Sequence, residues 1–332
     1  MLLSRHTRRR EFIAGIAGAA VSRYGATAQT TSRVYRVGLF STAAPLGNDS
    51  EQGAAFLRGM KQAGYVLGQN LAVERRGARG RIEQLPALAQ ELIAAGADVL
   101  VVNGYRTALA AKATGHPTVV AAGIGDAVVT GLVESLARPG GNITGISESA
   151  AELSTKRLGL LKELVPGLRQ VAMLWNQDDL GMTLRYRASA QAAESLGVRV
   201  QTLGVREPDD FEAACAAMNA DTPDAILMVA DTLTNLNRKR VFDYAVERRL
   251  PAIYELAFLV RDGGLMSYGP DLGELYERAA ALVDRILRGE KPADLPFEQP
   301  TRYLFAINLK TAKAIGLEVP PLLLARADEV IE

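Results

Sequence analysis

The sequence predicts an α/β protein of two lobes, each a doubly wound parallel sheet. From Val34 onward, short apolar runs alternate with longer amphipathic stretches, which is typical of β–α units with helices on both faces of a sheet. The alternation stops in a dense turn-forming segment, residues 138–145, and then starts again. About 300 residues follow the N-terminal leader, and a chain of that size usually divides into two domains.

The first set of elements lies before the turn-forming segment. Its helices are expected to stop at Gly64 and Gly96, because glycine readily adopts the left-handed conformation that ends a helix. A helix rich in alanine follows the third strand. The strands are predicted at 35–40, 71–75, 98–102 and 117–122, with helices at 51–63 and 82–95.

The second set repeats this pattern after residue 145, without residue-level repetition of the first. Gly263 and Gly264 then precede a last strand, 265–268, and a long helix, 275–287. Two consecutive sets of β–α units are what two similar lobes would produce. Strands in the second set are predicted at 170–175, 199–203, 225–229 and 252–255, with helices at 153–164, 186–196, 209–218 and 238–248.

Residues 1–28 are predicted to be a secretory signal peptide. A basic stretch leads into an apolar one, 12–21, which is too short to span a bilayer and precedes the small residues of a cleavage site, 26–28. The arginine pair 9–10 is similar to the twin-arginine export pattern, although Arg8 stands where Ser or Thr is usual. An ordinary Arg-rich secretory signal is the alternative. Either signal sends the mature chain to the periplasm.

The composition argues against several kinds of partner. The signal contains five arginines and one glutamate, so the 38 basic and 37 acidic residues of the chain become 33 and 36, a net charge of −3. A nearly neutral, slightly acidic protein is a poor candidate for nucleic acid. Cys215 has no second cysteine with which to form a disulfide. No segment of the mature sequence has the run of apolar residues that a membrane span needs.

The residues that the commonest enzymes need are scarce. His116 is the only histidine of the mature chain, so a Ser or Cys nucleophile would have one candidate base, at a strand start. One histidine and one cysteine far apart match no metal-site spacing. Segment 123–126 lacks the third glycine of the dinucleotide fingerprint, and no phosphate-loop lysine occurs. We therefore expect a protein that is not an enzyme and that holds no metal or cofactor.

Four stretches of the mature chain form a recognisable set. They are LARPGGNITG at 136–145, GGLMSYGPD at 263–271, INLKTAKA at 307–314, and PP at 320–321 followed by LARADEVI at 324–331. Together they resemble the substrate-binding proteins of bacterial ABC importers, in particular the branch that includes tryptophan- and tyrosine-binding members. Each stretch alone is moderately specific, but their common order covers essentially the whole mature chain.

The resemblance implies a type I periplasmic-binding fold, in which the chain crosses between the lobes three times, giving a three-stranded hinge. Carried onto this sequence, it predicts one lobe from 34–144 plus 264–294 and the other from 145–263 plus 297–332. It also implies a monomer that closes around a small ligand by hinge bending, with an ABC permease and its ATPase subunit as partners. A sensor module that feeds a receptor kinase is the alternative. A sugar-responsive repressor shares this core but begins with a DNA-binding domain, where this chain has a signal.

The ligand site is predicted where the strands end. In doubly wound sheets, ligands bind outside the carboxyl ends of the strands, and both lobes would present these ends to a shared cleft. The candidates of the first lobe are Ser41, Thr42, Gly104, Tyr105, Thr107, Gly125, Asp126 and Tyr268, and those of the second are Trp175, Asn176, Asp231, Thr232, Tyr254 and Glu255.

Three features of this set indicate an amino-acid ligand with an apolar or aromatic side chain. Thr107 is placed to cap a helix whose first N–H groups suit a ligand carboxylate, although such a cap needs no ligand. Asp231 and Glu255 are the alternative counter-ions for a buried ligand ammonium group, and either can instead be an ordinary helix-start acid. Four rings at strand ends would sandwich a planar side chain, with core packing the alternative for each. These rings belong to Tyr105, Trp175, Tyr254 and Tyr268.

Overall fold

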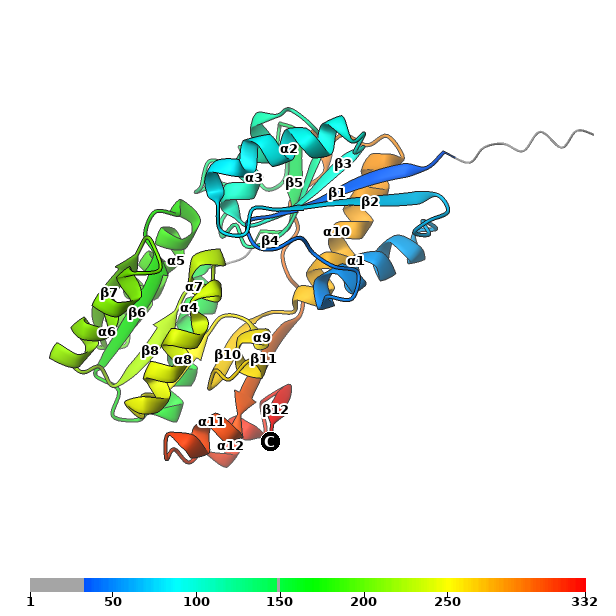
Figure 1. Cartoon of the computed structure of the whole chain (residues 1–332). Coiled ribbons are helices and arrows are strands. Elements are labelled where there is room, and N and C mark those ends of the chain that lie inside the picture. The colour runs from blue at the N-terminus through cyan, green and yellow to red at the C-terminus, as the bar shows by residue number, and fades with distance from the viewer. Residues whose placement is uncertain (1–32, 148–149) are drawn as a thin grey trace, which may run out of the picture. The chain divides into compact units, whose positions relative to one another are not determined.

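The first lobe contains a parallel five-stranded sheet. The structure is a computed structural model that describes residues 33–147 and 150–332, so the predicted signal, residues 1–28, lies outside it. The strand order is β2-β1-β3-β4-β5, and Figure 1 labels these strands. The strands are β1 (Tyr35–Ser41), β2 (Leu71–Gly77), β3 (Val99–Asn103), β4 (Thr118–Ala122) and β5 (Ile143–Gly145).

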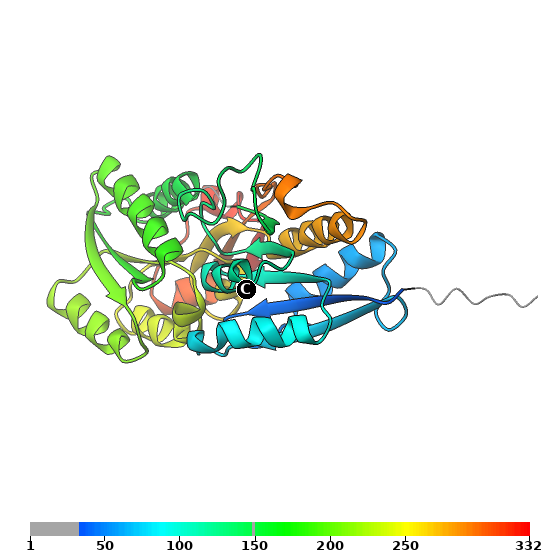
Figure 2. The same ribbon diagram turned by 90° about the horizontal axis from the view of Figure 1, so that it is seen from above.

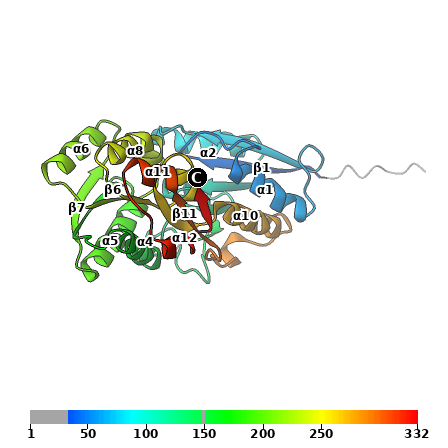
Figure 3. The ribbon, with the colours of Figure 1, turned by 90° about the horizontal axis from the view of Figure 1, so that it is seen from below.

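Helices cover both faces of this sheet. Successive side chains of a strand point to opposite faces, so Val37 and Leu39 pack with α1 and α10, whereas Phe40 packs with α2 and α3. Figure 3 labels α1 and α10 on one side of β1 and α2 on the other, and Figure 2 shows the orange and cyan helices on opposite sides of the blue strand. The helices are α1 (Glu51–Gln62), α2 (Leu85–Ala94), α3 (Tyr105–Ala113) and α10 (Leu272–Leu287).

The second lobe contains a seven-stranded sheet in the order β12-β11-β10-β9-β8-β6-β7. Its two faces also have separate cores: Met173 packs on one side, with α4 and α5, and Leu174 on the other, with α6 and α8. The strands are β6 (Gln170–Asn176), β7 (Arg199–Val205), β8 (Ala225–Met228), β9 (Ala252–Tyr254), β10 (Met266–Pro270), β11 (Tyr303–Asn308) and β12 (Glu329–Ile331). The helices are α4 (Ala150–Leu164), α5 (Leu180–Ser195), α6 (Asp210–Ala220), α7 (Thr232–Leu236), α8 (Arg238–Glu247), α9 (Ala257–Arg261), α11 (Leu309–Ala314) and α12 (Pro321–Leu324). The predicted α/β architecture of two doubly wound sheets is confirmed.

Most predicted elements lie within a few residues of their expected ends, with three exceptions. Helix α5 begins at Leu180, six residues before the predicted start, because the Asp179 carboxylate accepts the N–H of Met182 at 3.1 Å and caps the helix there. The turn-forming segment contains the short strand β5. The start of the helix predicted at 82–95 forms a separate 3-10 turn, Ile82–Gln84, ahead of α2.

Strand β10 lies in the second sheet, whereas the family resemblance places residues 264–294 as a whole in the first lobe. β10 pairs in parallel with β9 and antiparallel with β11, and Met266 stands opposite Ile253 and Ile307. The helix that follows, α10, packs in the core of the first lobe. An apolar strand followed by a helix fits either sheet, and strand pairing is not visible in the sequence, so the expected boundary at residue 264 differs from the sheet that β10 joins up to Pro270.

The antiparallel pair β10–β11 also departs from the purely parallel sheets that were expected. β10 leads out of the second sheet toward α10 in the first lobe, and the chain returns from that lobe as β11. A strand that comes back beside the one that left must run in the opposite direction. The antiparallel pairing is therefore a consequence of the crossings themselves.

Three crossing segments run side by side between the lobes. The N–H of Ser147, after β5, donates to the carbonyl oxygen of Glu298 at 2.9 Å, and the N–H of Glu298 donates to Gly145 at 2.9 Å. The N–H of Asp271, after β10, donates to the carbonyl oxygen of Arg302 at 3.1 Å. The third segment, between η2 (Pro292–Asp294) and β11, is thus hydrogen-bonded to the first two, as a three-stranded hinge requires.

Candidate functional site

The carboxyl ends of strands from both sheets meet at the candidate site. The hydroxyl of Thr42, after β1, is hydrogen-bonded to that of Thr232, after β8. The guanidinium of Arg106, after β3, donates to the carbonyl oxygen of Asp178, after β6. These contacts follow the order of the strands along both sheets, so the two carboxyl edges are in contact at the ends of two neighbouring strands of each sheet.

The first lobe contributes small residues to this edge. The hydroxyl of Ser41 is used within its own loop, where it donates to the carbonyl oxygen of Ala44 at 2.9 Å. Gly104 and Gly125 have φ angles of +93° and +68°, which an L side chain rarely adopts. A Cβ atom at Gly125 would lie 3.6 Å from the carbonyl oxygen of Gly181 in the other lobe. Gly125 therefore lies against the second lobe, whereas the atoms nearest to a Cβ at Gly104 belong to Thr107 and Thr42 of its own lobe.

The sequence suggests that Thr107 caps helix α3, but in the structure it does not. The cap position is Gly104, which has no side chain, and the Thr107 hydroxyl points back to donate to the carbonyl oxygen of Gly104 at 2.7 Å and to that of Asn103. Within the first turn of a helix, a threonine hydroxyl readily reaches the carbonyls three and four residues before it. The first N–H groups of α3 therefore have no side-chain acceptor at their cap.

Tyr105 and Asp126 are both engaged within the first lobe. The Tyr105 hydroxyl donates to the carbonyl oxygen of Thr130 at 3.3 Å, and burial raises the pKa of this phenol. The Asp126 carboxylate accepts the N–H groups of Val128 and Val129 at 2.9 and 3.0 Å. Asp126 thus shapes the turn after β4.

Two aspartates of the second lobe face the contact. Asp231 caps α7 by accepting the N–H of Thr234 at 2.8 Å, and it also accepts from the Asn176 amide at 2.6 Å. Asp179, which is 5% exposed, lies 3.7 Å from the Arg106 guanidinium. Burial raises the pKa of both carboxyl groups, and the charge of Asp231 adds to the shift of Asp179. The structure therefore brings together two of the predicted site residues, Asn176 and Asp231, with Asp179 near them.

Sequence reasoning missed Asp179. The signal was present, because Asp179 follows strand β6 and precedes a helix, just as Asp231 follows β8 and precedes α7. The sequence predicts a helix from residue 186, whereas α5 begins at Leu180, so Asp179 falls outside the predicted elements.

Glu255 is not available to a ligand ammonium group. It is 2% exposed, and its two carboxylate oxygens accept from Arg157 at 2.8 Å and from Arg185 at 2.9 Å. The N–H of Ala230 donates to the same carboxylate at 2.9 Å. Burial alone would raise the pKa of Glu255, but the two guanidinium groups outweigh it and hold the pKa below its ordinary value. The expected role of Glu255 as a counter-ion for the ligand is corrected to that of a buried partner of two arginines.

The sequence contains a signal for these two buried arginines, although neither is among the predicted site residues. Arg157 lies on the face of α4 that carries Leu153 and Leu161, four residues away on either side, and that face packs into the core. A cation on the apolar face of a helix needs a buried anion. Arg185 stands in the same way on the buried face of α5.

The four aromatic rings do not form a sandwich. Tyr254, 1% exposed, lies in the core against Phe242, and Trp175 stacks on Tyr186 with ring centres 3.7 Å apart. Tyr268 stacks on Tyr303 at 6.0 Å. Each of these three rings has a protein partner, and the Tyr105 hydroxyl is bonded within its own lobe, so core packing accounts for them better than a ligand cage does.

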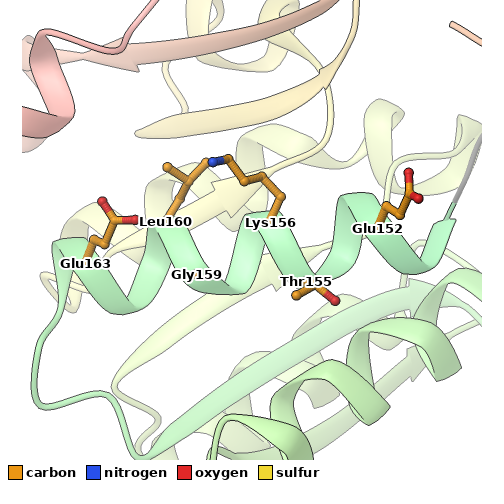
Figure 4. Close-up of a pocket in the computed structure, with 6 residues that line it drawn as sticks. All are labelled: Glu152, Thr155, Lys156, Gly159, Leu160 and Glu163. Atoms are coloured by element: carbon orange, nitrogen blue, oxygen red, sulfur yellow. The ribbon is translucent and has the colours of Figure 1, made fainter.

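A hollow elsewhere on the surface does not coincide with this site. It has a volume of about 440 Å³ and follows one face of α4, with Lys156, Gly159 and Leu160 among its lining residues (Figure 4). It is open and is lined by a single helix, so it has none of the facing groups that would orient a ligand. We take the contact between the strand ends, not this hollow, as the candidate site.

The described parts of the chain contain neither a metal-binding cluster nor a membrane-spanning helix. Within residues 33–147 and 150–332, no three His, Cys, Asp or Glu side chains are grouped so that they could hold a metal ion. Over the same ranges, none of the helices combines the length and apolar character that crossing a membrane requires.

Comparison with known proteins identifies the family. The chain is 24% identical over 264 residues to the tyrosine-binding protein of Clostridioides difficile (strain R20291), covering 79% of this chain and 76% of that protein. Two solved structures share the fold, each over 90% of this chain and 100% of the other. One is a conserved domain protein of Vibrio cholerae O1 biovar El Tor, with a TM-score of 0.83 and 24% identity. The other is an ABC domain from Streptococcus pneumonia in complex with L-Trp, with a TM-score of 0.82 and 23% identity.

These likenesses and the architecture agree with the type I periplasmic-binding fold that the four sequence stretches implied. The family model described as ABC transporter substrate binding protein matches residues 48–331, which is most of the chain. The chain therefore belongs to the ABC transporter substrate-binding protein family, whose members bind a solute rather than transform it.

Proposed function

We propose that this protein is exported to the periplasm and captures an amino acid with an apolar or aromatic side chain for an ABC importer. The observation that carries the proposal is the meeting of two carboxyl edges, where Asp179 and Asp231 of one lobe face Arg106 and the uncapped start of α3 in the other. An amino acid carries one group of each charge. Its ammonium suits the two aspartates, and its carboxylate suits the helix start and the arginine.

The class of side chain is supported by the relatives rather than by the rings of this chain. One relative is named a tyrosine-binding protein, and a structural neighbour holds L-Trp. Ser41, Thr42, Gly104 and Gly125 are small residues, so the first lobe presents few bulky side chains to a ligand at this edge.

The proposed cycle needs no covalent chemistry from this chain. A ligand that bridges both lobes binds the closed form more tightly and shifts the population toward it by that difference. Asp231 and Asp179 would bind the ammonium group only when ionised, and burial raises the pKa of both. Affinity should therefore fall on acidification, starting at a higher pH than an ordinary aspartate would impose.

A thermal-shift screen against the twenty amino acids tests the ligand class. L-Tryptophan, L-tyrosine or other apolar amino acids should raise the melting temperature of the mature protein, because a ligand that binds only the native state stabilises it. The variant Asp231→Asn should lose most of this rise, whereas Asp126→Asn should keep it. A rise with sugars or polyamines and none with amino acids would reject the ligand class but leave the family assignment standing.

Export is tested separately, by cell fractionation. Replacing Arg9 and Arg10 by lysine should trap the precursor in the cytoplasm if the twin-arginine route is used. Unchanged processing would assign export to the general secretory route, and a cytoplasmic wild-type protein would reject export altogether.

A further inference from the structure

Arg261 joins three elements that are far apart in the sequence. It lies at the end of α9 in the second lobe, and its Nε and Nη2 atoms donate to the two carboxylate oxygens of Glu329 on β12 at 2.8 Å each. Its Nη1 atom donates at 2.8 Å to the carboxylate of Glu51, the first residue of α1 in the first lobe. The Arg261–Glu329 pair thus lies within the second lobe, whereas the Arg261–Glu51 pair joins the two lobes.

The contact with Glu329 prepares Arg261 for Glu51. A guanidinium that is held by two parallel hydrogen bonds has already lost most of its side-chain freedom, so a third bond costs little further entropy. Hydrogen bonds from Arg261 to Glu329, together with the charge of Glu51, raise the pKa of Arg261 above its ordinary value, so its charge is permanent. Glu51 also lies in the first turn of α1, where an anion is favoured by the helix dipole and is held in place.

The position of this ion pair separates it from the ligand-facing groups. Along the two sheet edges, the contacts run from Glu51–Arg261 through Thr42–Thr232 to Arg106–Asp179. Asp179 also caps α5, so changing it would disturb the second lobe itself. Glu51, by contrast, does not cap a helix, because the cap of α1 is Ser50.

We propose that Glu51 and Arg261 form a latch between the lobes and act as positioning residues for ligand capture. The inference rests on the proposed capture of a ligand by lobe closure. The ion pair exists only when the lobes meet, so it stabilises the closed form and leaves the open form unchanged. Apparent affinity scales with the closed population, and the latch therefore contributes to affinity without touching the ligand.

The expected size follows from the exposure of the pair. The side chains of Arg261 and Glu51 are 39% and 43% exposed, and exposed pairs typically contribute about 0.2–1 kcal/mol. That corresponds to a roughly 1.4- to 5-fold change in the dissociation constant. Most of the change should appear in the dissociation rate, because the latch forms after the ligand has entered.

The test uses L-tryptophan and L-tyrosine as probes of the full mature chain. At about 10 mM ionic strength, Glu51→Gln should weaken binding by roughly 1.4- to 5-fold and Glu51→Lys by more, since a lysine at this position would repel Arg261. At about 1 M ionic strength the variants and the wild type should converge, because charges on the surface are then screened within about 3 Å. The matched control is Glu91→Gln, which removes the exposed pair with Arg76 inside the first lobe and should leave affinity unchanged.

Equal affinity of Glu51→Gln, Glu51→Lys and the wild type at low ionic strength would overturn the latch. If neither amino acid binds the wild type, the proposed ligand class fails, and small-angle scattering of the ligand-free protein decides the latch instead. The Glu51→Lys variant should then be more expanded than the wild type at low ionic strength and equal to it at high ionic strength. Superimposable profiles at both ionic strengths would reject the inference.

Discussion

At the scale of single residues, the buried charges of Glu255, Arg157 and Arg185 in the second lobe are stabilised by one another. Glu255 lies between Arg157 and Arg185, and Arg157 also donates from Nε to the carbonyl oxygen of Tyr268 at 2.7 Å. The cluster thus ties the end of β9 to two helices and to the strand that leads into the hinge. Breaking such a buried pair costs far more than its formation contributes, because the remaining charge stays buried.

Replacing Glu255 by Ala should lower the free energy of unfolding by about 3–5 kcal/mol, because it leaves both arginines without this carboxylate. Urea unfolding followed by circular dichroism measures the change. Glu91→Ala, at an exposed ion pair, is the control and should cost about 1 kcal/mol at most. A cost for Glu255→Ala no larger than that of the control would contradict the role given to the cluster.

The pH dependence of this cost has a definite sign. The pKa of Glu255 is lowered in the folded protein, so the native state keeps the carboxylate charged where the unfolded chain would take up a proton. The contribution is complete above the ordinary glutamate pKa of about 4.3 and is lost as the pH falls through the lowered value. The stability difference between wild type and Glu255→Ala should therefore stay constant near neutrality and shrink only in acid.

At the scale of elements, a glycine in strand β10 allows this strand to lie close to the end of β9. A Cβ atom at Gly269, in the buried strand β10, would lie 1.8 Å from the backbone carbonyl oxygen of Glu255, which directly follows β9. Neither can move without displacing a strand. A glycine is required here because two backbones approach each other, not because of an unusual φ angle.

Gly269→Ala should therefore destabilise the protein by about 1–3 kcal/mol or more, the usual cost of overpacking. A Cβ atom at Gly159, on α4, would have no other atom within 4 Å, so Gly159→Ala should stabilise the protein by about 0.5–1 kcal/mol through the better helix propensity of alanine. Thermal unfolding of both variants compares the two glycines directly. Equal effects of the two substitutions would show that the close approach at Gly269 has been overestimated.

At the scale of the whole molecule, the three crossing segments determine how the lobes can move. Ser147, Asp271 and their partners are joined by backbone hydrogen bonds in adjacent segments, so bending in one segment must be accompanied by bending in the others. Such a hinge favours rotation of two rigid lobes over independent movement of loops.

Ligand binding should consequently reduce the radius of gyration of the mature protein. Small-angle scattering with and without saturating L-tryptophan measures it, and glycerol at the same concentration serves as the control. A bound ligand, seen as a raised melting temperature, with no change in scattering would mean that the lobes are already closed without ligand.

The amino-acid sequence by itself determined the α/β class, the two sets of β–α units and the strand ends at which Asn176 and Asp231 stand, because these follow from local periodicity and from residues that end helices. Only the tertiary structure decided that β10 joins the second sheet, that Asp179 accompanies Asp231, and that Glu255 is buried between Arg157 and Arg185. Strand pairing, burial and ion pairs between distant residues depend on contacts across the fold. Tyr254 illustrates the limit, since its place after an apolar run suits a cleft as well as a core, and only packing against Phe242 distinguishes the two.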